Sequence, residues 1–290
     1  VVLYTETATD AYNGQTVAIT KTGNVTTTTT DNTLSGGVKL SDVQTYQPGH
    51  FVRAIKKSMH SVSDSLWHFS DTDDPTEWNV STGGSGVVNL SNHTRGSEEL
   101  QSIAQYFNNL AIFAKQSIQV WFWDPDPNLI SQVQVLNNTG ALSPDSVVEF
   151  GDSDVFYLSE SGIRSLRARD SSNSAHVGDI GNPIDDTIQG EVQTNRSQAE
   201  NAVGILDPRD GRYLLAIGNK IYVFSYFPGS KVSAWSVYEP GFTVTDWAFD
   251  GKQVLCRAGD ALYSLGGENN TTYDSSTVTV QMPFLDAQKP

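Results

Sequence analysis

The chain has 290 residues, of which 38% are hydrophobic and 18% are charged, and its formal net charge is −15. The length allows a large buried core, either in one big domain or in two ordinary ones. A charge this negative argues against wrapping a nucleic-acid backbone, which needs clustered Lys and Arg, although an acidic wall would let DNA slide past it.

The single cysteine, Cys256, excludes a disulfide within the chain, so we do not expect a secreted, disulfide-stapled scaffold. Its apolar neighbours predict a buried, unreactive thiol. The sequence shows no signal peptide, lipidation motif or apolar stretch of membrane-spanning length. Because the chain starts with Val1 in the middle of a pattern, we expect a processed product or a part of a longer polypeptide.

Residues 1–45 are rich in threonine and contain the low-complexity run NVTTTTTDNTLSGG. Threonine favours extended backbone, so this segment is predicted to form strands or an extended arm, and disorder is the alternative. We treat it as a part of uncertain class, separate from residues 46–290.

From Tyr46 onward, short apolar runs alternate with turn clusters, which is typical of many short strands joined by tight turns. Four turns have hairpin chemistry: Asp-Gly in residues 206–213 and 248–253, Ser-Gly in 158–164 and Gly-Asn in 216–221. Residues 213–217 are apolar at every position, which predicts an inner strand that is covered on both faces.

Two segments are predicted to be helical. Residues 95–107 begin with acidic side chains and place Leu100, Ile103 and Phe107 at helical spacing. Residues 182–192 offer Asn182 as an N-cap with proline at the first helical position. Neither segment is long enough to indicate an α/β fold.

The second half of the chain repeats one pattern: an apolar strand, a Gly-containing turn, and an apolar strand that carries Tyr near its end. It occurs at residues 149–166, 210–226 and 249–265, with a spacing near the roughly 40 to 50 residues of a propeller blade. We therefore predict an all-β, β-propeller-like fold with short helical insertions over residues 46–290. A β-sandwich is the alternative.

The segment LWHFSDTDDPTEWN (66–79) concentrates carboxylates and indoles. A helical-hand calcium loop would start at Asp71 and Asp73, but Pro75 occupies a ligand position and no Glu follows at the right distance. The Asp-box of sialidase-like propellers, S-x-D-x-G-x-x-W, aligns on Trp78 with Asp73 as its aspartate. It then has Asp71 in place of Ser and Pro75 in place of Gly.

We therefore interpret this segment as a structural turn, and a subunit interface is a further candidate role for it. Two tryptophans are predicted to be packing anchors, and three aspartates and a proline are predicted to form the turn. These residues are Trp67, Trp78, Asp71, Asp73, Asp74 and Pro75.

Other chemistries have weaker support. A sialidase needs several converging arginines, whereas the one local cluster, Arg164, Arg167 and Arg169, is expected to be a solvated strand or a salt-bridge surface. The five histidines are scattered without metal-ligand spacing. The glycine-rich residues 81–86 are predicted to be a flexible loop rather than a phosphate cradle. No catalytic, cofactor or metal site is predicted, and the chain is not expected to be an enzyme.

Four further segments occur in a characteristic order: residues 108–121, 144–166, 182–188 and 200–226. Together they resemble the tail nozzle, or hub, proteins of short-tailed bacteriophages, which include packaged-DNA stabilisation proteins and tail tubular protein B. Residues 66–79 fit as well, since the family often has Phe-Ser-Asp, an acidic Asp-Pro turn and then Trp. The closing residues 277–290 resemble the strand after the propeller, at which the family continues.

The resemblance covers residues 46–290 and implies a structural virion protein of the tail, without catalytic activity. Such a subunit forms a homo-oligomeric ring, typically a hexamer, below the portal and adaptor rings and next to tail fibre, spike or needle proteins. The ring continues the DNA channel, retains the packaged genome and conducts it during ejection without reading its sequence. The family's greater usual length supports an incomplete C-terminus here.

Two other functions stay open at this point. A carbohydrate-binding or carbohydrate-active propeller, such as a tailspike or lectin-like module, is suggested by the Asp-box-like turn and by Trp121 and Trp123, which could stack on sugars if they are exposed. Core packing is the favoured interpretation of these two indoles. A metal-stabilised adhesin built on the aspartates of residues 71–74 is the third hypothesis.

Overall fold

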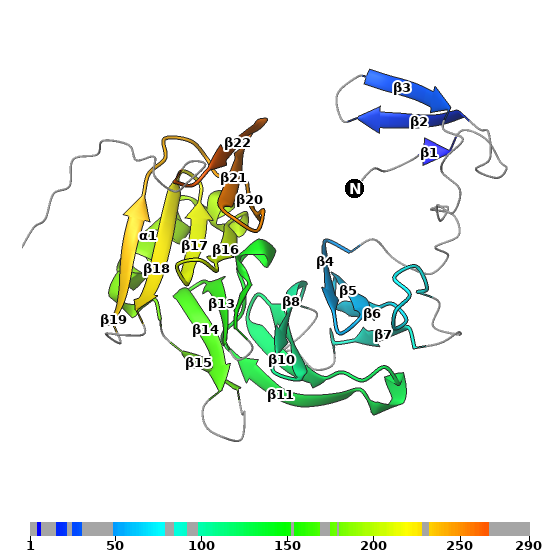
Figure 1. Cartoon of the computed structure of the whole chain (residues 1–290). Helices are drawn as coiled ribbons and strands as arrows, with labels where there is room; N and C mark the ends of the chain where they lie inside the picture. The colour runs from blue at the N-terminus through cyan, green and yellow to red at the C-terminus, as the bar shows by residue number, and fades with distance from the viewer. Residues whose placement is uncertain are drawn as a thin grey trace, which may run out of the picture. The chain divides into compact units, whose positions relative to one another are not determined.

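The computed structural model of the chain consists largely of antiparallel sheets in two compact units, Val1–Gly190 and Glu191–Pro290 (Figure 1). It describes residues 5–6, 16–21, 25–30, 49–78, 84–91, 98–151, 154–168, 175–178, 180–227 and 232–266. The closing residues 277–290 lie outside the described ranges. None of the helices in these ranges is long and apolar enough to cross a membrane.

The described residues of the first unit form four sheets. In the threonine-rich segment, three strands form a small sheet in the order β1-β2-β3, and three four-stranded meanders follow, named here sheets I, II and III. Their strands are β1 (Thr5–Glu6), β2 (Thr16–Lys21) and β3 (Val25–Thr30); in sheet I, β4 (Phe51–Ile55), β5 (Ser58–Ser63), β6 (Leu66–Phe69) and β7 (Gly86–Asn89); in sheet II, β8 (Leu100–Tyr106), β9 (Asn109–Ala114), β10 (Ser117–Phe122) and β11 (Ser131–Asn137); and in sheet III, β12 (Val148–Phe150), β13 (Asp154–Ser159), β14 (Gly162–Ala168) and β15 (Ala175–Gly178).

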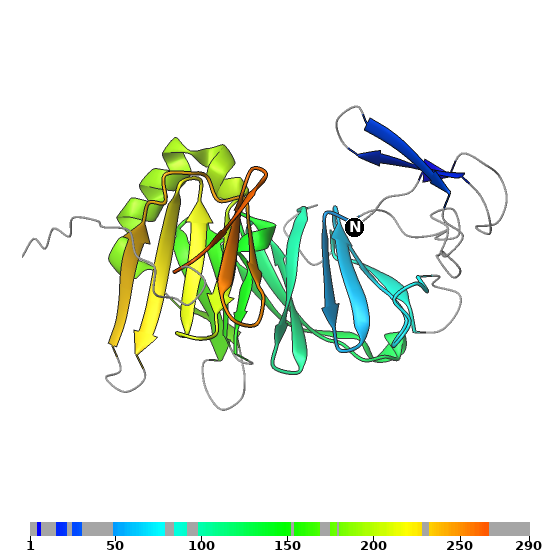
Figure 2. The same ribbon diagram turned by 45° about the horizontal axis from the view of Figure 1, so that its top comes forward.

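The second unit contains two sheets, IV and V, and each of these is also a meander of neighbouring strands (Figure 2). Sheet IV has four strands and sheet V has three in the described part. The strands are β16 (Val203–Asp207), β17 (Arg212–Ile217), β18 (Lys220–Phe227) and β19 (Val232–Tyr238), then β20 (Asp246–Phe249), β21 (Val254–Ala258) and β22 (Ala261–Ser264). The described residues also form the short helices η3 (Pro127–Leu129), η4 (Pro144–Ser146), η5 (Asn182–Ile184), α1 (Asp185–Thr194) and α2 (Arg196–Glu200).

Sheets I to V begin at residues 51, 100, 148, 203 and 246, a repeat of about 50 residues, as in propeller blades. The predicted all-β, propeller-like class with short helical insertions is therefore confirmed. The four predicted hairpin turns are present as well. Gly211 and Gly218, for example, have φ values of 62° and 60°, a conformation that glycine adopts without steric cost.

The helix predicted within residues 95–107 is wrong, because Leu100–Tyr106 form strand β8. Leu100 and Ile103 belong to the core between sheets I and II, whereas Ala104 and Tyr106 belong to the core between sheets II and III. A strand buried on both faces shows no alternation, so its apolar residues reached helical spacing by chance. Residues 182–192 are helical as predicted, and the helix continues to Thr194, with Gly181 rather than Asn182 as the N-cap.

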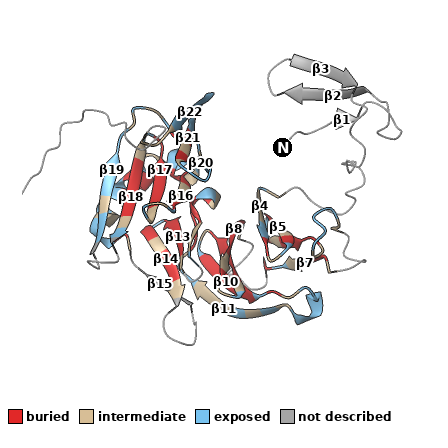
Figure 3. Ribbon diagram, viewed as in Figure 1, coloured by how far each residue is buried: buried red, intermediate tan, exposed pale blue. Residues whose placement is uncertain are grey.

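The core lies between neighbouring sheets. In the first unit, sheet I packs against sheet II through Trp67, Phe69, Trp121 and Trp123, which all lie in one buried cluster. In the second unit, Cys256 of sheet V packs with sheet IV, and burial raises the pKa of its thiol. Strand β17 is buried along most of its length, as predicted for an inner strand (Figure 3).

A fully buried histidine, His60, lies in the aromatic cluster between sheets I and II. The indole N–H of Trp67 donates to its Nδ1 at 3.2 Å, so Nε2 carries the proton and donates to the carbonyl oxygen of Ile55 at 3.2 Å. The ring also stacks on Trp67 and contacts Trp123 edge-on. Burial lowers the pKa of His60 to about 4, against the opposing hydrogen bond to Ile55 and with a smaller lowering effect from the charge of Lys56.

Glu149 ties together the first strands of sheets I, II and III. Its Oε1 accepts a hydrogen bond from the backbone N–H of Gln105 on β8 at 2.7 Å and one from Nη1 of Arg53 on β4 at 3.1 Å. Arg53 also donates to the carbonyl oxygen of Val147 at 3.4 Å. Because β8 is an edge strand, its outward N–H groups need partners. One oxygen of Glu149 therefore accepts hydrogen bonds from both a strand-edge N–H group and an arginine.

Acid should weaken the first unit through His60. The folded pKa of about 4 lies below the ordinary value of 6.5, so the unfolded chain takes up the proton first and stability falls as pH drops from about 6.5 to 4. We expect a loss of about 2 kcal/mol between about pH 7 and 5. Denaturant unfolding at both pH values measures it, and His60→Gln should flatten the dependence. An equal pH dependence in this variant would contradict the assignment.

Removing the carboxylate of Glu149 should destabilise the first unit. Glu149→Ala leaves the N–H of Gln105 without its acceptor, which costs about 1–3 kcal/mol. Glu149→Gln keeps an oxygen acceptor and should cost less than about 1 kcal/mol, because the ion pair with Arg53 is partly solvated. Urea unfolding compares both variants with Glu200→Ala, which removes an exposed helix pair and should cost less than about 0.5 kcal/mol. Equal effects of all three substitutions would refute the role of Glu149.

Candidate functional site

The connection after β6 is held by its own aspartates. Asp71 forms an isolated antiparallel bridge with Asp74, and its Oδ1 accepts hydrogen bonds from the backbone N–H groups of Thr72 at 2.7 Å and Gly84 at 3.0 Å. Oδ1 of Asp74 accepts from the N–H and the hydroxyl of Thr76 at 2.9 and 2.7 Å. These bonds lower the pKa of the exposed Asp74 carboxyl. The carboxylates thus serve local turn geometry.

The remaining residues of this turn have separate environments. Asp73 has a φ of 62° and pairs with Lys57 at 3.1 Å on the exposed surface. Trp67 is completely buried in the core of sheets I and II. Trp78 is only half-buried, and its indole N–H donates to the carbonyl oxygen of Pro75 at 2.9 Å. The two tryptophans therefore have different roles, one in the core and one in closing the turn.

The described residues of this turn are not arranged as a metal site. Within the described ranges, no group of three or more His, Cys, Asp or Glu side chains is arranged to hold a metal ion. Oδ1 of Asp71 and Oδ1 of Asp74 are engaged by nearby N–H and hydroxyl groups. Residues 79–83, including most of the glycine-rich segment, lie outside the described residues.

Trp121 and Trp123 are 6% and 3% exposed, so core packing is confirmed for both. The indole N–H of Trp121 donates to Oε1 of Gln119 at 3.0 Å within sheet II. Neither ring offers an open face on which a sugar could stack, and this removes the main motivation for a carbohydrate site.

The predicted arginine cluster does not converge on one point. Arg164 makes a two-pronged ion pair with Asp185, with Nη1–Oδ1 and Nη2–Oδ2 distances of 2.8 and 3.0 Å. Arg167 is half-buried, and Arg169 lies outside the described residues. Of the histidines, His60 and His68 are buried, His50 is exposed, and neither His93 nor the side chain of His176 is described.

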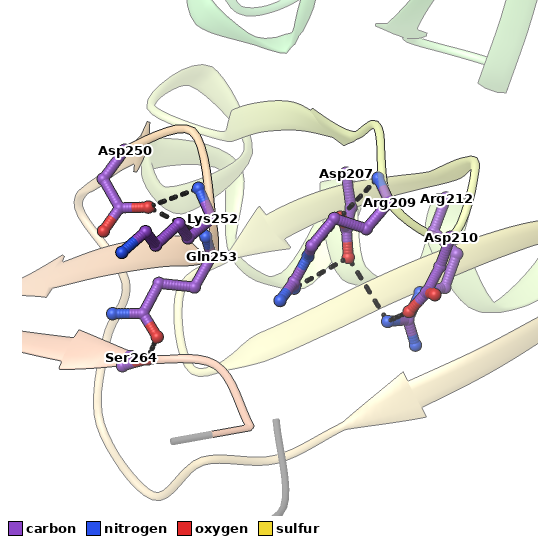
Figure 4. A network of polar contacts seen from close by, with 8 residues as sticks. All are labelled: Asp207, Arg209, Asp210, Arg212, Asp250, Lys252, Gln253 and Ser264. Atoms are coloured by element: carbon purple, nitrogen blue, oxygen red, sulfur yellow. Dashed lines mark hydrogen bonds and ion pairs between the residues drawn. The ribbon is translucent and has the colours of Figure 1, made fainter. Parts of the chain in front are cut away.

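A polar network that the sequence interpretation missed lies in the turn between β16 and β17 (Figure 4). Asp207 is fully buried, and Arg209 donates to its two oxygens from Nε at 3.1 Å and Nη2 at 3.2 Å. Arg212 reaches Oδ2 of Asp207 at 3.3 Å and also pairs with Asp210. Burial alone would raise the pKa of Asp207, but the bonds and charges of the arginines lower it.

The turn between β20 and β21 adds a third carboxylate to this region. Oδ1 of Asp250 accepts hydrogen bonds from the backbone N–H groups of Lys252 and Gln253, each at 2.8 Å, and these lower the pKa of its carboxyl. The side chain of Gln253 accepts from the hydroxyl of Ser264 at 2.8 Å. The charge of Asp250 also raises the pKa of Arg209, after the larger effect of Asp207. The hydrogen bonds and ion pairs of this network stabilise the conformations of the two hairpin turns.

The sequence signal for this network was the run Asp-Pro-Arg-Asp-Gly-Arg at 207–212, which had been interpreted only as a turn. What it cannot reveal is the complete burial of Asp207. A buried carboxylate requires paired cations, and the two arginines lie on the same hairpin. Two carboxylates are bonded to two guanidinium groups of equal total charge. This arrangement favours a role in stabilising the hairpin over a role in catalysis.

A small polar pocket of about 260 Å³ lies between turns of sheets II and III. Lys115, Thr139, Ser159 and Ser161 are among its lining residues. The hydroxyl of Thr139 is bonded to that of Tyr157 at 2.7 Å, and Ser159 donates to the carbonyl oxygen of Gly162 at 2.9 Å. Neither serine has a histidine beside it in the lining, so the pocket does not assemble a nucleophile with its base.

Comparison with solved structures agrees with the fold. BamB from Moraxella catarrhalis, which has a propeller-like fold, superposes with a TM-score of 0.51 at 9% identity, over 87% of this chain and 66% of that one. A protein from Lactobacillus plantarum gives 0.48 at 12% identity, over 72% and 64% of the two chains. A protein from Bacteroides uniformis, provisionally named a 6-phosphogluconolactonase, gives 0.46 at 11% identity, over 73% and 65%.

The chain thus spans about two thirds of the length of these structures. No protein-family model matches the sequence, and no curated protein sequence matches it. At these identities the likeness shows the fold alone. The chain is an all-β protein with a propeller-like fold.

Proposed function

We propose that this chain is a non-catalytic structural subunit of the tail nozzle ring of a short-tailed bacteriophage. In that ring it would continue the DNA channel below the portal and adaptor rings. It would also help to retain the packaged genome and conduct it during ejection. The partners in the proposal are further copies of the chain, the adaptor and portal, and tail fibre, spike or needle proteins.

The observation that carries the proposal is the order of the family-like segments along the fold. Residues 108–121 correspond to β9 and β10, residues 144–166 to η4 and β12–β14, and residues 200–226 to β16–β18. Residues 182–188 lie in η5 and the first turn of α1. The similarity therefore follows buried strands and their turns in sequence, which is what shared architecture would conserve.

The charge distribution is compatible with a conduit. The network of Figure 4 engages Arg209 and Arg212 with carboxylates, and Arg53 is paired with Glu149. A protein binds a phosphate backbone through many contacts with Lys and Arg, and these contacts release counterions. Arginines that are already paired with carboxylates contribute little to such binding. With a net charge of −15, the chain would repel a polyanion and leave DNA free to move.

Imaging tests the proposal. Electron cryo-microscopy of the purified full chain, and of particles whose genome encodes it, should show a closed ring with a channel wide enough for duplex DNA. Mass spectrometry should find the chain in purified virions, in a constant ratio to the portal protein. A chain that stays monomeric and is absent from these virions would refute the function.

A further inference from the structure

The first half of helix α1 is bonded to sheet III. Asp185, the first residue of the helix, accepts two hydrogen bonds of 2.8 and 3.0 Å from the guanidinium of Arg164 on β14. These two side chains are only 16% and 12% exposed. One turn later, Nε2 of Gln189 donates to the carbonyl oxygen of Ser161 at 3.0 Å. The hairpin of β13 and β14 therefore fixes the beginning of α1.

The second half of the helix is bonded to sheet IV. Glu191 is 8% exposed, and its Oε2 accepts hydrogen bonds from Nζ of Lys220 at 2.7 Å and from the hydroxyl of Tyr222 at 3.5 Å, both on β18. Its Oε1 accepts one from Nδ2 of Asn195 at 2.6 Å. A buried carboxylate is costly to separate from its cation, so this half of the helix is fixed as well.

Gly190 lies between the two sets of bonds. It is exposed, its backbone is helical, and a Cβ atom at this position would meet no atom within 4 Å outside the helix. Neither a close approach nor a left-handed backbone therefore requires glycine here. After proline, glycine is the residue that disfavours a helix interior most, because it has the greatest backbone freedom. Its presence weakens α1 at one point without a gain in packing.

The position of Gly190 on the helix favours bending there. Ile188 and Val192, one turn apart on the inward side, are 0% and 3% exposed, and Gly190 lies on the opposite side, which faces water. Backbone hydrogen bonds on the water side of a helix lengthen when the helix bends. The chain also divides into its two compact units directly after Gly190. The two sets of bonds thus belong to different units.

We propose that α1 is a hinge that bends at Gly190, so that the second unit changes its orientation while both ends of the helix stay bonded. The pairs Arg164–Asp185 and Lys220–Glu191 are charge-assisted and hold more strongly than neutral hydrogen bonds. The solvated backbone bonds around Gly190 therefore yield first. A few residues at the end or within one element are enough for such a motion. This inference does not depend on the nozzle function.

Distance measurements between spin labels test the hinge. Labels are placed in the full chain at Val133→Cys and Leu262→Cys, which are 56% and 72% exposed in the first and second units, with Cys256→Ala to leave only these two thiols. Double electron–electron resonance should give a broad distance distribution, and Gly190→Ala should narrow it, because alanine favours an unbent helix. Gln193→Ala, an exposed change in the same helix, is the matched control and should not narrow it.

Hydrogen exchange measures the helix itself. Amide protons of residues 190–194 should exchange about fivefold more slowly in Gly190→Ala than in the unchanged chain, since alanine disfavours local opening. Circular dichroism melting verifies that each variant folds, and Gly190→Ala should melt at an equal or higher temperature. A single narrow distance in the unchanged helix, or equal widths with glycine and alanine, would overturn the hinge. Equal narrowing by Gln193→Ala would do the same, because the effect would then belong to general helix stability.

Discussion

A meander of four short strands cannot hold a hydrophobic core by itself, so each sheet of this chain depends on the face of a neighbour. Trp67 is fully buried because sheet II lies across it, and sheet II in turn buries Phe113 against Tyr157 of sheet III. Truncation of one large aromatic in such an interface costs about 3–5 kcal/mol, a large part of a domain's stability.

This dependence also explains the position of polar groups at the sheet junctions. Glu149 lies where the first strands of three sheets approach, and it binds both an edge N–H group and the guanidinium of Arg53. His60 lies in the aromatic layer between two sheets, with both ring nitrogens bonded. Polar groups at a sheet junction must bring their own partners, and here they link elements that are far apart in sequence.

Features determined by local chemistry could be predicted from the sequence. The Gly-containing hairpin turns and the helix after Pro183 follow from a few adjacent residues, and the spacing of the turns indicated a propeller-like repeat. The secondary structure of residues 100–106 could not be predicted in this way, because Leu100 and Ala104 are buried by two different sheets. The spacing of apolar residues within the segment does not reveal that both faces of the strand are covered.

The turn that follows β6 shows the same limit of prediction from sequence. The bonds of its carboxylates follow from local Asx geometry, whereas the different environments of Trp67 and Trp78 depend on the distant sheet II. Asp207 is a further example, since the hairpin residues were visible but the burial of the carboxylate was not. Sequence patterns therefore predicted strand connections better than the environments of single side chains.

Three bonded carboxylates lie at the end of a strand or in the turns that join strands. Asp74 and Asp250 lie in connections and Asp207 is the last residue of β16, and their oxygens bind turn N–H groups or arginines. Their bonds act within single turns, whereas the contacts between neighbouring sheets are governed by burial of apolar surface.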